Sequence, residues 1–177
     1  AADDHLADVH GISPKNKQAV NLNKVTKDAT TLFVFKTVSE AHLGDLSFFR
    51  VLHGDLKSGQ DLINESSGRP ERVEQLFSMF GKTSKKMPVV ATGDIAAAVK
   101  LKDTHTNSTL SSNSFPVILS PIAFPEPVIA RAILPQNKAD DDDIGQALQA
   151  LPEEEPHFVV ITDSESNKIL HQQQRAL

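Results

Sequence analysis

Residues 32–38 read Leu-Phe-Val-Phe-Lys-Thr-Val, an apolar run dominated by aromatic and β-branched residues. This composition favours a strand over a helix. Similar runs recur as far as residue 110, and sequences rich in Gly, Asp and Ser separate them as turns. The further runs are Leu46–Leu52, Asp61–Asn64, Arg72–Phe80, Val89–Ala91, Ile95–Leu101 and Thr109–Leu110. This spacing predicts a mainly β fold for residues 30–116, either a barrel or a sandwich.

The pattern changes after Pro116. Residues 128–134 form a β-prone run between two prolines, and residues 158–162 and 168–171 read as a hairpin. Between them an amphipathic helix is predicted over 140–151, because apolar residues recur at i, i+3, i+4 and i+7 as Ile144, Ala147, Leu148 and Leu151. The sequence therefore predicts strand, helix, strand, strand for residues 117–177. Residues 1–29 show no sustained period, so we expect an extended leader with at most a short strand.

Composition excludes several functional classes. The chain has 177 residues without any Cys, and its 18 basic and 23 acidic side chains give a net charge of −5. No disulfide, thiolate nucleophile or cysteine-ligated metal can form, which fits a reducing compartment such as the cytoplasm. We find no apolar run of the roughly 18 residues that a membrane span needs, and no export signal at the start. A cytoplasmic protein with no membrane partner is expected.

Charge is unevenly distributed along the chain. Residues 1–29 carry no net charge, residues 30–116 carry +1, and residues 117–177 carry −6. Proteins that bind nucleic acid usually carry a basic excess, because counterion release supplies much of the affinity. The isolated chain is therefore expected to bind RNA weakly.

Motifs for catalysis, nucleotides and metals are weak or missing. Residues 137–140 read Asn-Lys-Ala-Asp, the NKxD pattern with which GTPases recognise guanine, but the sequence contains no phosphate-binding loop. The acidic runs 140–143 and 153–155 lack the alternation of a calcium loop, and the histidines lack zinc-binding spacing. No serine lies in a nucleophile-elbow motif. We expect no catalytic, cofactor-binding or metal-binding residues in this chain.

Phe48 and Phe49, beside Arg50, have two interpretations. They could form a platform on which nucleic-acid bases stack. Alternatively, because adjacent side chains on a strand point to opposite faces, one Phe would lie in the core and the other at a sheet or domain contact. The second interpretation is favoured.

Several stretches of the chain form a distinctive series. They are 46–51 with 54–59, Glu71-Arg72-Val73 with Met79, the run Gly93–Thr104 that contains Asp-Ile-Ala-Ala-Ala-Val, and the Phe-Pro-Glu-Pro-Val-Ile junction at 124–129. In this order they resemble bacterial translation elongation factor G and its ribosome-binding GTPase relatives. The resemblance implies that residues 30–116 form the second domain, a closed β-barrel. It further implies that residues 117–177 form part of a ferredoxin-like third domain, cut to βαββ, and that residues 1–29 lead out of a missing GTPase domain.

The resemblance also implies partners and cofactors. GTP and Mg²⁺ would be bound by the missing domain, which makes the NKxD match at 137–140 a coincidence. The ribosome, through its small-subunit RNA, and the chain's own GTPase domain would be the partners. From charge and loop position, the candidate RNA-contacting residues are Lys57, Arg69, Arg72 and Lys102. An incomplete third domain would leave residues 128–134 at an open sheet edge, so self-association is also expected.

Other interpretations remain open at this stage. Residues 81–90 differ from the usual factor, which leaves room for a low-activity paralogue or a ribosomal protection protein. A barrel that binds only other proteins, or a hydrolase assembled from distant residues, would also fit the composition.

Overall fold

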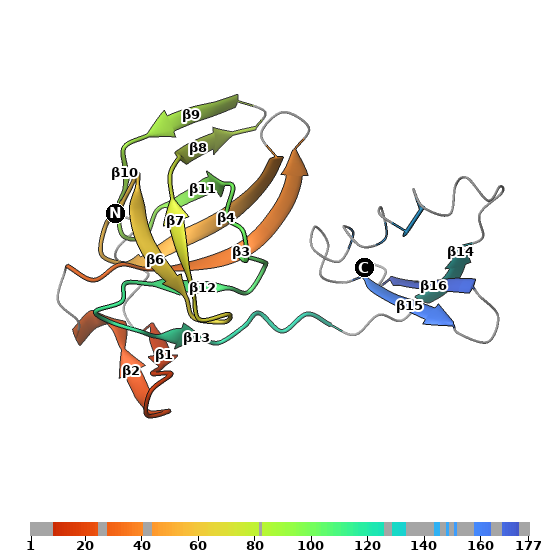
Figure 1. The fold of residues 1–177 in the computed structure, drawn as a ribbon, viewed down its shortest axis with the longest axis horizontal. Coiled ribbons are helices and arrows are strands. Elements are labelled where there is room, and N and C mark those ends of the chain that lie inside the picture. The colour runs from red at the N-terminus through yellow and green to blue at the C-terminus, as the bar shows by residue number, and fades with distance from the viewer. Residues whose placement is uncertain are drawn as a thin grey trace. The chain divides into compact units, whose positions relative to one another are not determined.

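The computed structural model describes residues 9–24, 28–40, 44–81, 83–125, 129–133, 144–145, 148, 151, 158–163 and 168–173. The chain divides into two compact units, Ala1–Ile122 and Ala123–Leu177. Strands predominate in both units (Figure 1). Within the described ranges, no helix is long and apolar enough to cross a membrane.

The first unit is a barrel-like β domain. Its elements are β1 (His10–Ile12), β2 (Ala19–Asn21), η2 (Leu22–Lys24), β3 (Thr31–Glu40), β4 (Gly44–His53), β5 (Leu56–Lys57), β6 (Gln60–Asn64), β7 (Arg69–Val73), β8 (Leu76–Phe80), β9 (Thr83–Met87), β10 (Val89–Val90), β11 (Ile95–Val99), β12 (Thr109–Ser111) and β13 (Ile118–Leu119). Eight strands form one antiparallel sheet in the order β7-β6-β12-β3-β4-β11-β8-β9.

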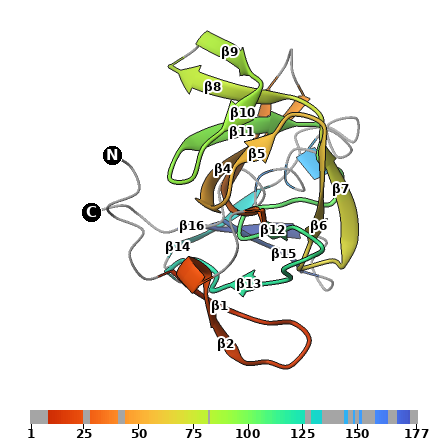
Figure 2. The ribbon, with the colours of Figure 1, turned by 90° about the vertical axis from the view of Figure 1, so that its left-hand side faces the viewer.

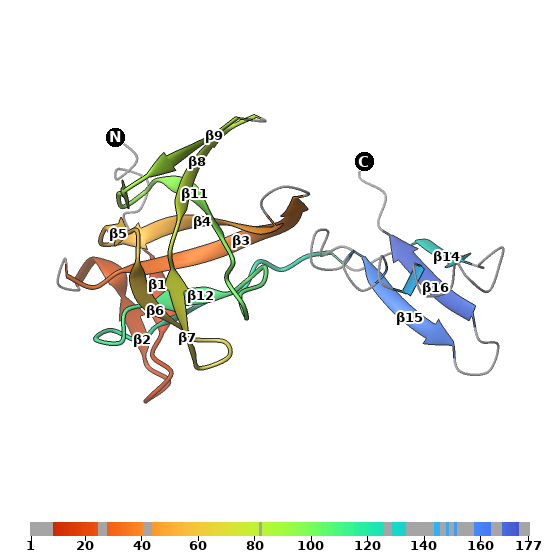
Figure 3. The same ribbon diagram turned by 45° about the horizontal axis from the view of Figure 1, so that its top comes forward.

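The sheet curls without closing directly. Among the described residues, no backbone pairing joins β7 to β9. Instead β10, which follows β9, pairs with β5 (Figure 2). Strand β5 directly precedes β6 (Figure 3). The predicted mainly β fold is therefore confirmed as a barrel-like domain. The closed barrel that the resemblance implies is not formed by the described sheets, because β5 and β10 pair in a separate two-stranded ribbon.

Alternate residues of the strands fill the barrel. Phe49 and Val51 of β4 face inward with Leu32 and Val34 of β3, and all four are buried. Each such side chain contributes about 1.5–3 kcal/mol when it leaves water. Phe48 faces the other side of the sheet, where it is half-buried against a second cluster of Leu46, Phe77, Ala97 and Val99. The packing interpretation of the Phe pair is therefore the one that the structure supports.

Two strand predictions need correction. The run Arg72–Phe80 is not one strand, because β7 pairs with β6 whereas β8 pairs with β11 in a distant part of the sheet. Strand β9 is not predicted from the sequence because Thr83–Lys86 are all polar and exposed. A strand at the sheet edge that buries neither face has no alternating pattern to reveal it.

The leader is more ordered than its sequence indicates. Strand β1 pairs with both β2 and β13, and Leu22 packs with Val117 and Leu119 in a third apolar cluster. The backbone of Gly11 lies close to the Val117 side chain, since a Cβ at Gly11 would lie 2.3 Å from a Val117 methyl carbon. The compact unit consequently extends to Ile122, beyond the boundary at residue 116 that the sequence suggested.

Glu65, in the turn after β6, provides a pH-dependent prediction. Burial raises its pKa, and the hydrogen bond from Ser111 and the charge of Lys15 offset only part of that rise. The folded chain therefore holds this proton more tightly than the unfolded chain. The resulting stabilisation is complete below the ordinary glutamate pKa and is lost as pH rises through the raised value.

Glu65→Gln keeps an oxygen that can accept the Ser111 hydrogen bond, so we expect it to remove this pH dependence. At neutral pH the variant should be as stable as the parent or more stable by a few tenths of a kcal/mol at most, because solvent screens a half-buried group. Urea unfolding across the acidic range measures the effect. An unchanged slope of stability against pH in Glu65→Gln would contradict the assignment.

The second unit contains β14 (Ile129–Ile133), β15 (Val159–Asp163) and β16 (Lys168–Gln173), in the antiparallel order β14-β16-β15. Ile144, Gly145, Leu148 and Leu151 are helical, and Leu148 is buried. The predicted order of strand, helix, strand, strand is confirmed for the described residues. The NKxD match at 137–140 and the acidic runs 140–143 and 153–155 lie outside them.

Strand β14 lies at one edge of its three-stranded sheet as described. An edge strand offers unpaired backbone groups to a second copy of the chain. We therefore still expect concentration-dependent self-association, to be measured by sedimentation over a wide concentration series. A monomeric profile throughout would contradict this expectation.

Candidate nucleic-acid interface

The four predicted RNA-contacting residues lie along the β6–β7 side of the barrel. Lys57 ends β5, Arg69 and Arg72 lie on β7, and Lys102 lies in the loop after β11. Arg69 and Arg72 are three positions apart, so their side chains leave the strand on opposite faces. Their Cα atoms are separated by about 10 Å, given a rise of about 3.3 Å per residue. The structure therefore places these cations near one another but does not form them into one patch.

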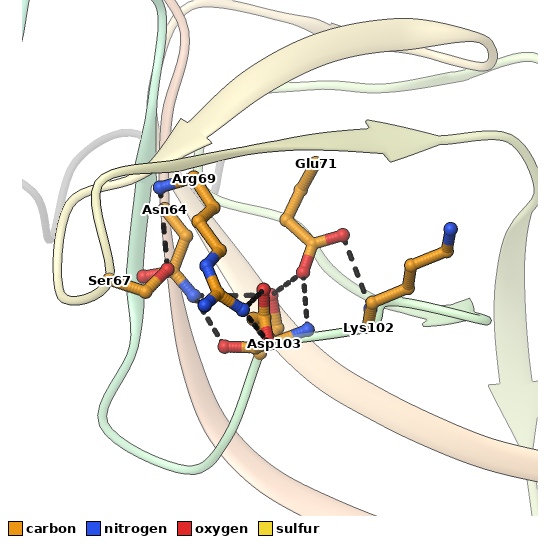
Figure 4. A network of polar contacts seen from close by, with 7 residues as sticks. Asn64, Ser67, Arg69, Glu71, Lys102 and Asp103 are labelled. Carbon is orange, nitrogen blue, oxygen red and sulfur yellow. Dashed lines mark hydrogen bonds and ion pairs between the residues drawn. The ribbon is translucent and has the colours of Figure 1, made fainter.

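Arg69 and Lys102 meet at a polar network around Glu71 (Figure 4). The buried Glu71 carboxylate accepts hydrogen bonds from the backbone N–H groups of Lys102 at 3.2 Å and Asp103 at 2.7 Å. It also accepts a bond from the Thr104 hydroxyl at 3.2 Å. Asn64, fully buried, donates to the Asp103 carbonyl at 2.7 Å. The network fixes the loop, and the Lys102 ammonium points away from it (Figure 4).

Arg72 lies near the other end of β7, beside the 57–60 turn. One of its terminal nitrogens is 3.8 Å from where a Cβ of Gly59 would be. The turn is held by a hydrogen bond of 3.0 Å from the Lys57 N–H to the Gln60 side chain. An open hollow beside it is lined by Asp28, Thr30, Asp55, Lys57, Ser58, Gly59 and Gln60. Two aspartates share this hollow with Lys57, so the hollow is not predominantly basic.

Both arginines already have carboxylate partners. Nη1 of Arg69 lies 3.0 and 2.9 Å from the two Asp103 oxygens, and Nη1 of Arg72 lies 3.2 Å from both Asp61 oxygens. The hydrogen bond and the charge of Asp103 raise the pKa of Arg69. Surface ion pairs of this kind contribute about 0–1 kcal/mol to stability. Their main consequence is that each arginine presents little net charge to a phosphate.

Replacing both arginines by glutamine should weaken RNA binding by the chain. The change leaves Asp61 and Asp103 unpaired, and the slope of log affinity against log salt should fall by about one for each phosphate that the variant no longer binds. Equilibrium binding at several salt concentrations measures this slope. The matched control removes both pairs together, as Arg69→Gln with Asp103→Asn and Arg72→Gln with Asp61→Asn, and should bind more tightly than the arginine variant. Unchanged binding in the arginine variant would remove both residues from the interface.

Among the residues that the structure describes, no site for Mg²⁺ is found, and residues 137–143, which include the NKxD match, lie outside them. Within the described part of the chain, no three His, Asp or Glu side chains cluster as metal ligands. The buried carboxylate of Glu71 is occupied with two backbone N–H groups and a hydroxyl. The phosphate-binding loop that nucleotide recognition requires is also missing from the sequence.

Comparisons with known proteins decide the family. The family described as Elongation factor G domain 2 matches residues 29–113, and the family described as Elongation Factor G, domain III matches residues 124–172. The chain belongs to the elongation factor G family. A crystal structure of a protein from Thermus thermophilus is similar in fold over 82% of this chain, with a TM-score of 0.71 and 23% identity. The chain spans 22% of that protein's length.

This elongation factor G domain 2 carries further cations that sequence reasoning did not select. Lys85 and Lys86 lie on β9, and both are exposed. The signal that could have found them is their charge environment, because the sequence between Glu74 and Asp94 contains three lysines and no carboxylate. Sequence reasoning misses them because the segment lacks the pattern of a strand.

Proposed function

We propose that this chain acts in protein synthesis as the ribosome-docking part of an elongation-factor-G-type GTPase that promotes translocation. The observation that carries the proposal is that the second and third domains of elongation factor G match one chain in their family order. Such docking takes place in the cytoplasm, where translating ribosomes are found. The small-subunit RNA is the proposed contact.

In this proposal the chain provides a surface that binds the ribosome, and GTP hydrolysis belongs to a GTPase domain outside these 177 residues. Support comes from two observations: the described carboxylates form no cluster that fits Mg²⁺, and the sequence contains no phosphate-binding loop. A rigid domain such as this barrel can transmit a change in its neighbour to the ribosome. Its buried core, to which β3, β4, β5, β6, β7, β8, β10, β11 and β12 contribute, provides that rigidity.

Ribosome pelleting tests the docking role. The purified chain should sediment with small ribosomal subunits at low salt, and bacterial elongation factor G should displace it. Binding driven by charge alone would not be displaced by the factor, so the competitor is the control. A chain that fails to pellet, or that pellets without competition, would contradict the docking role.

A GTP hydrolysis assay tests whether this chain itself hydrolyses GTP. The purified chain, with and without ribosomes, should release phosphate from GTP no faster than buffer. The variant Asp140→Ala checks the NKxD match at 137–140. A rate above background that this variant abolishes would overturn the assignment of GTP hydrolysis to another domain.

A further inference from the structure

Strand β9 differs from the rest of the barrel surface in its charge. In Figures 1 and 2 it lies at the edge of the sheet, with β8 as its only neighbouring strand among the described elements. Thr83, Ser84, Lys85 and Lys86 are four consecutive exposed residues, and each side chain can donate hydrogen bonds. The side chain of neither lysine forms an ion pair or hydrogen bond with any described residue.

The lysines of β9 differ from the other basic residues of the barrel because the sequence around β9 contains no acidic residue. Arg69 and Arg72 have carboxylate partners, and Lys57 shares its hollow with Asp28 and Asp55. Residues 9–27 also contain four lysines and no acidic residue, but the charge of Lys15 among them acts on Glu65. No described carboxylate forms an ion pair with Lys85 or Lys86, so their positive charges are available to attract phosphate.

We propose that Thr83–Lys86 of β9 form a phosphate-binding strip that contacts the RNA backbone. Lysines and hydroxyl groups are common phosphate ligands, and they fix the position of a protein on RNA without reading its sequence. Lys85 and Lys86 leave the strand on opposite faces, so a backbone that runs along the edge reaches both. The proposal rests on the proposed function only in naming RNA as the polyanion.

An acidic peptide fits this edge less well. Peptides that add to a sheet edge gain specificity from pockets for alternate side chains. β9 offers no such pockets among its described residues, since Met87 packs inward against the core and Thr83–Lys86 are exposed. Lysines on an edge strand also disfavour pairing with another strand. These residues instead fit the repeated negative charges of an RNA phosphate backbone.

Titration with a short RNA duplex of mixed sequence tests the strip. At low salt, NMR shift changes of the full chain should concentrate on β8 and β9. Lys85→Gln with Lys86→Gln should weaken binding about tenfold and lower the salt slope by about two. The matched control, Lys15→Gln with Lys17→Gln, removes the same charge from the turn between β1 and β2 and should lose much less affinity.

Each other outcome overturns the proposal. Equal losses in the two variants would show that only net charge matters, and shift changes centred on β6 and β7 would place the contact elsewhere. Tighter binding of a polyglutamate peptide than of RNA at β9 would identify a protein partner. Absence of RNA binding at low salt would also refute the strip.

Ribosome pelleting with the same variants separates this proposal from the proposed function. Weaker pelleting of Lys85→Gln with Lys86→Gln than of the control variant supports the strip. Equal pelleting of both variants with the parent refutes the strip and leaves the docking role intact. If the parent chain does not pellet, the docking role fails, and the RNA duplex titration still decides whether β9 binds phosphate.

Discussion

Gly54→Ala should lower the free energy of unfolding by about 4 kcal/mol, enough to unfold a large share of a marginally stable domain. Gly54 has a φ of +67°, which costs another residue about 1–3 kcal/mol. A Cβ at this position would also lie 2.1 Å from the Ala29 carbonyl oxygen, so the backbone must move. Overpacking of this kind costs about 1–3 kcal/mol more.

Gly68→Ala is the matched control for this substitution. Gly68 has a φ of +71°, close to that of Gly54, but nothing lies within 4 Å of its Cβ position. Urea unfolding of the two variants therefore separates the backbone conformation from the steric clash. We expect Gly68→Ala to lose only about 1–2 kcal/mol. Similar losses in both variants would show that the Ala29 contact contributes nothing.

The location of Gly54 explains why the effect should be large. Its carbonyl accepts a hydrogen bond of 2.6 Å from the Thr92 hydroxyl, and the neighbouring Asp55 carbonyl accepts one of 2.8 Å from Thr30. The turn after β4 is thereby tied both to the segment that leaves the leader and to the segment before β11. A shift at Gly54 displaces all three together.

The strands of the barrel core could be predicted because their buried positions are occupied by apolar residues in a recognisable pattern. β3 and β4 alternate or cluster apolar residues, and the turns beside them contain glycines with positive φ, such as Gly54. Elements whose stability comes from distant partners could not be predicted in this way. β1 and β13 are only three and two residues long, and they pair with each other from opposite ends of the first unit.

In the candidate site, too, the contacts between residues that are distant in sequence could not be predicted. Charge and loop position selected Arg69 and Arg72, but sequence gives no sign that Asp103 and Asp61 neutralise them. Glu71 lies between them and reads locally like another exposed charge. It is buried because its hydrogen-bond donors lie at residues 102–104, which only the folded sheet brings close.

Glu71→Ala should lower the free energy of unfolding by about 3–4 kcal/mol and should also disorder the loop that carries Lys102. The substitution removes the acceptor for two backbone N–H groups and the Thr104 hydroxyl in a largely buried place. A buried donor left without a partner costs about 1–3 kcal/mol, and bonds to a charged acceptor lie at the upper end. Glu71→Gln keeps one oxygen but turns an NH₂ group toward a donor, so we expect an intermediate loss.

Arg69→Ala is the control for Glu71→Ala, because it removes the exposed half of the same network. The Arg69 side chain is 68% exposed, so its loss should change stability by less than about 1 kcal/mol. Urea unfolding gives both values, and amide hydrogen exchange at residues 102–104 reports on the loop. If Glu71→Ala is no more destabilising than Arg69→Ala, the loop is held by its own backbone. The position of Lys102 would then be set by the end of β11 and not by its hydrogen bond to the buried carboxylate of Glu71.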